Sequence, residues 1–343
     1  MLFASLITAI PVNASAADEN EPKKCIECNK EAIEISSYED LNKIRENLSG
    51  CFILTDDIDC EGKEFTPIEG SFTGHFDGNN HKVLNLKING SEKVGFFSSI
   101  SSGTVENFAI EDAKIKATGS DIGILVGVAE NAKISNCYVK GEIEGLSRIG
   151  GISGSGISKT TYTNCYSYLS KITSKSNEYD VAGISGGNDS TIKAINCYTI
   201  SDGQKSPICG SIDYNNDKLT EENFEYCYYN EEFEKNKFTE FADFGIKDSQ
   251  MTNKDTYKSW DFDNVWQIDN TKNSGYPYLK SFLEKGNSLE ITPGNVVVAK
   301  GHEQNFNLQL KINGKVVLPT ETKWSIEGNT STDTNIDKME NLP

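Results

Sequence analysis

Cysteine is the first residue type in this chain whose spacing could support chemistry. Cys25 and Cys28 form a C-x-x-C pair, which occurs both in zinc sites and in redox-active pairs. A zinc site of this kind needs a second C-x-x-C pair or two histidines, and the sequence contains no such pair to complete the site. In a secreted chain we therefore favour a disulfide, either local or to a neighbouring loop through Cys51 or Cys60, over a metal site.

Carboxylates and histidines form the next candidate group. Asp56, Asp57 and Asp59 could coordinate calcium, because hard cations take clustered carboxylates. Their loop lacks a complete ligand pattern, so we favour solvated, turn-forming carboxylates. His75 and His81 flank an Asp-Gly-Asn-Asn turn, where structural roles are favoured over catalytic ones.

Two motifs near the C-terminus are incomplete. His302 and Glu303 begin like a zinc-protease motif, but Phe306 occupies the position of the second histidine. The run from Leu318 to Thr322 resembles a sortase signal that lacks its final glycine and its apolar tail. We therefore predict no metal, no cofactor and no catalytic residue.

The elements that must position any surface site come from an internal repeat. Residues 122–127 read Ile-Gly-Ile-Leu-Val-Gly, and related blocks begin at Val94, Ile149 and Val181, with a degenerate copy at 205–210. A second motif follows each block, and its recurring side chains are Asn107, Asn136, Asn164 and Asn196, Cys137, Cys165, Cys197 and Cys227, and Tyr138, Tyr166, Tyr198 and Tyr228. The cysteines are 28, 32 and 30 residues apart.

A period of this length, with short β-branched runs broken by Gly, Asn and Ser, indicates a β-solenoid and not a helical repeat. Each coil would lay its strands about 4.8 Å from those of the previous coil, around one continuous core. Equivalent residues would then stack as ladders. The sequence predicts an all-β fold.

The two paired blocks resemble the GLUG-motif family, whose repeat has a V-G-G-L-V-G block followed by an I-x-N-C-Y block. Residues 94–210 carry the resemblance best, and the match is most specific at 122–127 together with 134–138. The resemblance implies a right-handed parallel β-helix and an extracellular setting, since such repeats occur mainly in bacterial surface and adhesin-like proteins. It supplies no catalytic residues.

The ladders carry three expectations. We predict that Cys137, Cys165, Cys197 and Cys227 lie inside as free thiols, because stacked coils hold their Cβ vectors parallel and a disulfide needs a dihedral near 90°. The asparagines are expected to be structural. Each tyrosine follows a ladder cysteine and so should point outward, where the column could bind a flat sugar ring. We favour the alternative that the rings brace adjacent coils or are covered by the segment 213–247.

Further segments complete the predicted organisation. Residues 1–16 have an apolar run and an A-x-A-like site typical of a signal peptide, and 17–32 form an N-terminal segment. The β-helix should span 33–280, with a capping helix that begins at a capping box, Ser36 to Glu39, and ends at Gly50. A closing segment at 249–280 should plug the last coil with its bulky aromatic side chains. Residues 281–288 read as a linker, and 289–343 resemble a truncated bacterial Ig-like β-sandwich.

Charge and composition limit the partners. Lys and Arg number 33 against 51 Asp and Glu, a net charge of −18, so nucleic acid is an unfavourable partner. No transmembrane segment is expected. We predict a secreted or surface-displayed, non-catalytic binding or adhesin-like protein, with a glycan or a host or cell-surface protein as partner. The alternatives are a polysaccharide lyase or glycoside hydrolase, since β-helices host both, and the non-catalytic N-terminal region of a larger enzyme.

Overall fold

The computed structural model describes residues 30–175, 180–201, 219–232 and 244–282, several residues between 203 and 211, and strand segments at 24–25, 288–292, 307–312 and 315–317. The chain forms two compact units, Met1–Lys280 and Ser281–Pro343. The predicted signal peptide at 1–16, residues 213–218 and 233–243 and the side chains of Cys25 and Cys28 lie outside the described residues.

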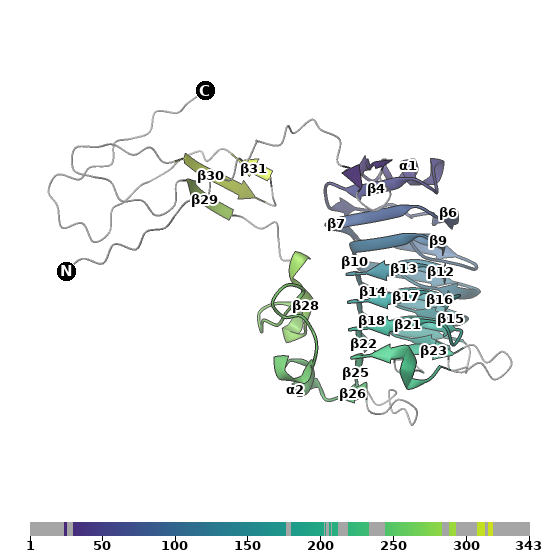
Figure 1. Cartoon of the computed structure of the whole chain (residues 1–343). Coiled ribbons are helices and arrows are strands. Elements are labelled where there is room, and N and C mark those ends of the chain that lie inside the picture. The colour runs from purple at the N-terminus through teal and green to yellow at the C-terminus, as the bar shows by residue number, and fades with distance from the viewer. Residues whose placement is uncertain are drawn as a thin grey trace, which may run out of the picture. The chain divides into compact units, whose positions relative to one another are not determined.

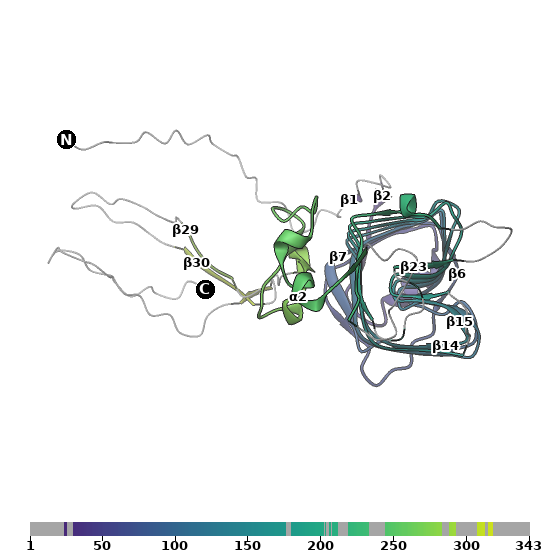
Figure 2. The same cartoon turned by 90° about the horizontal axis from the view of Figure 1, so that it is seen from below.

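The first unit is a right-handed parallel β-helix, as predicted (Figures 1 and 2). Successive coils pair in parallel: in the largest sheet, Val105 of one coil pairs with Ile134 of the next, which pairs with Tyr162. Viewed along the axis, the coils superimpose into a ring of walls around one core (Figure 2). The approximately 30-residue repeat of the sequence is therefore one coil of the solenoid.

Three sheets form the walls. The largest contains β3 (Ile33–Ile35), β4 (Cys51–Leu54), β5 (Ile58–Asp59), β7 (His75–Leu84), β8 (Lys87–Gly90), β10 (Thr104–Ala117), β13 (Lys133–Ser135), β14 (Tyr138–Gly145), β17 (Thr161–Thr163), β18 (Tyr166–Ser174), β21 (Lys193–Ile195), β22 (Tyr198–Ser201), β24 (Phe224–Glu225), β25 (Tyr228–Asn230) and β26 (Gly245–Ile246). The second contains β6 (Ile68–Phe72), β9 (Phe97–Ser101), β12 (Val126–Glu130), β16 (Ser153–Ile157), β20 (Ser185–Asn188) and β23 (Cys209–Ser211). The third contains β11 (Ser120–Ile122), β15 (Ser147–Gly150) and β19 (Val181–Ala182).

An asparagine ladder turns the largest sheet through a corner. The four predicted asparagines all have positive φ, near 50°, a backbone region that asparagine tolerates better than most residues. Three of the side-chain amides donate to the carboxamide oxygen of the asparagine in the preceding coil: Asn136 to Asn107 at 3.1 Å, Asn164 to Asn136 at 3.0 Å and Asn196 to Asn164 at 3.1 Å. Asn107 donates to the carboxylate of Asp77 at 3.1 Å. The recurring asparagine thus sets the bend and links the coils.

The glycines of the first repeated block permit close approach between chain segments. A Cβ at Gly154 would lie 2.2 Å from the backbone of Asp121, and one at Gly186 would lie 2.3 Å from the amide of Ile149. No side chain fits at such distances. This explains why the blocks that begin at Ile122, Ile149 and Val181 all have glycine at their last position.

The first coil is covered by the short helix α1 (Leu41–Glu46), which lies at the N-terminal end of the solenoid (Figure 1). Leu41 and Ile44 are buried in the core, so the predicted capping helix is present. It is shorter than predicted, and the expected capping box does not form: Asp40 is the N-cap residue, and its carboxylate accepts hydrogen bonds from the amide and hydroxyl of Ser36. The side chain of Asp40, and not that of Glu39, therefore holds the turn that precedes the helix.

The closing segment does not plug the last coil as predicted. It contains α2 (Asp248–Met251), η4 (Lys254–Thr256), β27 (Trp266–Gln267), η5 (Asn273–Gly275), β28 (Tyr278–Leu279) and η6 (Lys280–Phe282). These elements run along the outside of the wall formed by β14, β18 and β22 (Figures 1 and 2). We call residues 248–280 the side strap. The aromatic side chains of the side strap pack against the tyrosines of that wall.

The second unit contains a three-stranded antiparallel sheet of β29 (Ser288–Thr292), β30 (Asn307–Ile312) and β31 (Lys315–Val317). At the N-terminus, β1 (Lys24–Cys25) and β2 (Lys30–Glu31) form an antiparallel pair. The rest of the predicted Ig-like segment, residues 293–306, 313–314 and 318–343, lies outside the described residues. One further short helix, η1 (Glu221–Asn223), precedes β24.

Candidate functional site

The predicted tyrosine column exists as a stack of rings. Tyr138, Tyr166, Tyr198 and Tyr228 pair in register on β14, β18, β22 and β25. The ring centroids of Tyr138 and Tyr166 are 4.6 Å apart with an interplanar angle of 4°, and those of Tyr166 and Tyr198 are 4.9 Å apart at 11°. Parallel stacking follows directly from the spacing of parallel strands.

The side strap covers this column. Trp266 lies 6.1 Å from the rings of both Tyr166 and Tyr198, and Trp260 stacks on Trp266 at 4.3 Å. As a result Tyr138, Tyr166 and Tyr198 are only 3%, 2% and 1% exposed. These three residues are therefore not an exposed sugar platform, which is the less favoured of the two interpretations of the column. Within the described residues, Trp266, Asn273 and Pro277 of the side strap supply contacts to the column.

Polar contacts fix the strap in place. The hydroxyl of Tyr198 donates to the carbonyl oxygen of Pro277 at 2.5 Å, and Asn273 donates to that hydroxyl at 3.0 Å. Lower on the wall, Asp248 accepts hydrogen bonds from Asn230 at 2.9 Å and from Tyr276. The fourth tyrosine, Tyr228, is half-buried against Tyr257 and Trp260. The column thus acts as a docking surface for the chain's own strap.

A charged cluster stands at the N-terminal end of the column. Glu111 accepts a hydrogen bond from Tyr138 at 2.6 Å, and the ammonium groups of Lys82 and Lys140 lie 3.5 and 3.7 Å from the same carboxylate oxygen. Burial alone would raise the pKa of Glu111, but Lys82, Tyr138 and Lys140 outweigh it and hold that pKa below its usual value. Burial also lowers the pKa of Lys140. One carboxylate therefore balances two cations beside the stacked rings.

The cysteine ladder is buried. Cys137, Cys165, Cys197 and Cys227 are all free thiols with 0% exposure. Each lies beside backbone carbonyl oxygens, as in the 3.3 Å contact from the sulfur of Cys165 to the oxygen of Thr163. Cys60 is likewise a buried free thiol, whereas Cys51 is disulfide-bonded. Burial raises the pKa of Cys165 and Cys227, so these thiols are held in the unreactive neutral form.

The carboxylates and histidines of the first coils are used in local structure. Asp57 accepts from His81 at 3.0 Å and from the amide of Lys82 at 3.0 Å. His75 contacts Glu106 at 2.9 Å in the next coil. Within the described residues, no group of three or more His, Cys, Asp or Glu side chains is placed to hold a metal ion.

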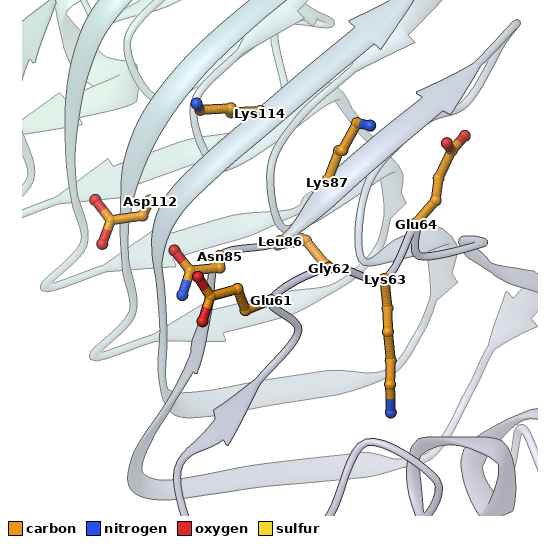
Figure 3. A pocket seen from close by; sticks show the side chains of 9 residues that line it. All are labelled: Glu61, Gly62, Lys63, Glu64, Asn85, Leu86, Lys87, Asp112 and Lys114. Atoms are coloured by element: carbon orange, nitrogen blue, oxygen red, sulfur yellow. The ribbon is translucent and has the colours of Figure 1, made fainter.

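A surface hollow of about 350 Å³ lies beside the loop of the first coil, lined by residues 61–64, 85–87, 112 and 114 (Figure 3). Lys87 and Lys114 stand on one side of it, and Glu61, Asn85 and Asp112 gather on another. Sequence analysis did not single out these residues. Six of the nine are exposed charged residues that share no sequence motif, and the turn at 61–64 brings them together with residues 85–87, 112 and 114 around one concave surface.

Three comparisons relate the chain to known proteins. Residues 27–141 match the family model described as the M26 IgA1-specific metallo-endopeptidase N-terminal region. The immunoglobulin A1 protease of Streptococcus sanguinis is 32% identical over 134 residues, which is 36% of this chain and 7% of that protein. Halomucin of Haloquadratum walsbyi is 31% identical over 142 residues, which is 35% of this chain and 2% of that protein. The chain therefore spans only a small part of the length of these relatives.

A solved structure shares the fold. The crystal structure of a provisionally named immunoglobulin A1 protease from Bacteroides ovatus has a TM-score of 0.56 and 19% identity, and the match covers 73% of this chain and 93% of that one. At this identity the likeness bears on the fold alone. Among the described residues of our chain, no helix is long and apolar enough to cross a membrane.

Proposed function

We propose that this chain is a non-catalytic β-helix region of a larger extracellular protein, in which it acts as a binding, adhesive or spacer element. The observation that carries the proposal is the match of residues 27–141 to the N-terminal region of a metallo-endopeptidase family. That match covers α1, every strand from β3 to β13 and the start of β14, which are walls of the β-helix. In a region without a catalytic centre, the residues that carry function are those on the surface.

The architecture suits a rigid element. Neighbouring coils in the regular part of the solenoid are joined by parallel strand pairing, by hydrogen bonds between asparagine side chains and by stacked tyrosine rings. A solenoid of this kind transmits load through nearest-neighbour contacts. We further propose that coils 94–210 are GLUG-type repeats, that residues 289–343 begin an Ig-like domain, and that residues 1–16 direct secretion. The antiparallel pairing of β29, β30 and β31 supports the second of these proposals.

A digestion assay tests the non-catalytic role. The purified 343-residue chain is incubated with immunoglobulin A1, with and without added zinc, because the Streptococcus sanguinis relative is named as a protease of that substrate. We expect the immunoglobulin to remain intact on a gel in both conditions. Specific cleavage that needs the folded chain would overturn the proposal.

A further inference from the structure

The hollow beside residues 61–64 has features of a ligand site that the fold does not require. We propose that it binds an acidic sugar residue, a hexuronate or a sialic acid, with the sugar carboxylate held by Lys87 and Lys114. Its volume, about 350 Å³, lies at the lower end of the range for small-molecule sites, roughly 300–1,000 Å³. The inference rests on the proposed binding role and assigns it a site and a ligand class.

The two lysines form an unusual pair. Lys114 of β10 and Lys87 of β8 are direct partners in neighbouring parallel strands, so their side chains leave the sheet on the same side about 4.8 Å apart. Like charges at such positions destabilise a sheet. Among the described residues, neither lysine forms an ion pair, and both are exposed. Glu64 pairs with Lys87 and Glu142 pairs with Lys114, so one carboxylate flanks the two lysines on each side. An anion bound between the lysines would offset the repulsion that remains.

The opposite side of the hollow offers hydrogen-bond acceptors. Glu61, Asn85 and Asp112 gather there, across from the lysines (Figure 3). A bare anion would gain nothing from these groups, and a basic ligand would be repelled by the lysines. A sugar acid has a carboxylate for the cationic side and several hydroxyl donors for the acceptor side. The hollow therefore fits that class better than either simple ion.

The rim of the hollow is held in place without a ligand. Asp59 accepts hydrogen bonds from the amide of Glu61 at 2.8 Å and from the side chain of Asn85 at 2.9 Å. Lys63 points away from the hollow, toward Glu39 at 2.8 Å, and so leaves the space open (Figure 3). A preorganised rim lowers the entropy cost of binding.

Titration calorimetry on the full 343-residue chain tests the proposal at low salt. The probes are a methyl glucuronide, a methyl sialoside, methyl glucoside and acetate. We expect at least one acidic sugar to bind at least about tenfold more tightly than methyl glucoside and acetate, which is the gain from one charge-assisted hydrogen bond. The two acidic probes then distinguish a uronate site from a sialic acid site.

A double variant assigns the binding to the two lysines. Lys87→Gln with Lys114→Gln should weaken the acidic sugar by at least about tenfold. The matched control is Lys116→Gln with Lys171→Gln, which removes the same charge from exposed positions outside the hollow. This control should bind like the parent chain, and thermal melting checks that both variants fold.

Three results would overturn the proposal: no binding of either acidic sugar, equal binding of methyl glucoside, or an equal loss in the control variant. The last result would mean that net charge, and not this hollow, attracts the sugar. A failure here is distinct from a failure of the proposed function, because the immunoglobulin digestion gives its result without any sugar.

Discussion

At the scale of single residues, the solenoid depends on side chains that recur at one inward position in each coil. Leu125, Ile152 and Ile184 are each 0% exposed, and the backbone amide of each of the first two donates to the carbonyl oxygen of the next residue in the series. The core around them is apolar and closely packed. A charge at this position would have neither water nor a partner.

Leu125→Asp should therefore destabilise the β-helix by about 4 kcal/mol or more, since it removes a buried side chain and buries an unpaired carboxylate. Urea unfolding followed by circular dichroism measures the change. Thr118→Asp adds the same charge at an exposed position and should change stability by less than about 0.5 kcal/mol. Equal stability of the parent chain and the Leu125 variant would show that the inward column is assigned incorrectly.

The buried thiols give a second residue-scale prediction. We expect Cys137, Cys165, Cys197 and Cys227 to react with a thiol reagent only after denaturation, because all four are fully buried in the native chain and a reagent cannot reach them. Titration in denaturant without reductant should find them free. Quantitative pairing among the four would refute the ladder.

The same burial makes stability depend on pH. Burial raises the pKa of Cys60 to about 11, whereas an unfolded cysteine has a pKa of about 8.5. Between these values the unfolded chain loses a proton that the native chain keeps, so stability falls as pH rises. Melting temperatures measured from pH 7 to pH 10.5 should decline above about pH 8.5, and Cys60→Ala should decline less steeply.

At the scale of elements, the sequence identified the segments but not all of their positions. The recurring Asn-Cys-Tyr motif was enough to predict the coils, their inward cysteines and the stacking of equivalent residues, because a repeat forces every copy into one local geometry. The side strap has no repeat to fix it. Its tryptophans predict that it packs against an apolar surface. The sequence of the strap does not show whether that surface is the end of the solenoid or the tyrosine column on its side.

Trp266 holds the strap to the column and gives the element-scale prediction. It is 0% exposed and contacts two column tyrosines, so Trp266→Ala should cost about 3–5 kcal/mol. The variant should also expose Tyr166 and Tyr198, which increased binding of a hydrophobic dye would report. Phe262→Ala, at a half-exposed strap position, is the control and should cost clearly less. A Trp266 variant as stable as the parent would mean that the strap adds nothing to the fold.

Polar side chains inside the core show where sequence reasoning stops at the molecular scale. Ser153, Tyr162 and Ser185 lie in a buried hydrogen-bonded group, with Ser153 bonded to Tyr162 at 2.6 Å and to Ser185 at 2.8 Å. Small polar residues in a repeat normally indicate outward positions. Here Ser153 and Tyr162 are bonded within one coil, and both are bonded to Ser185 of the next coil, so the full group exists only after the coils have stacked. The charged hollow likewise forms only when residues from different parts of the chain come together in the folded solenoid.

For the whole molecule, the division into units 1–280 and 281–343 leads to a final prediction. Each solenoid coil is stabilised by its neighbours, and the strap belongs to the first unit, so we propose that the β-helix folds without the second unit. A chain ending at Phe282 should then melt within about 2 °C of the full chain, since it keeps all of the first unit. A chain ending at Lys247 also loses the strap, exposes the tyrosine column and should melt well below both. If the two truncations melt at the same temperature, the strap is not part of the cooperative solenoid. If the longer one already melts low, the second unit is required for the fold.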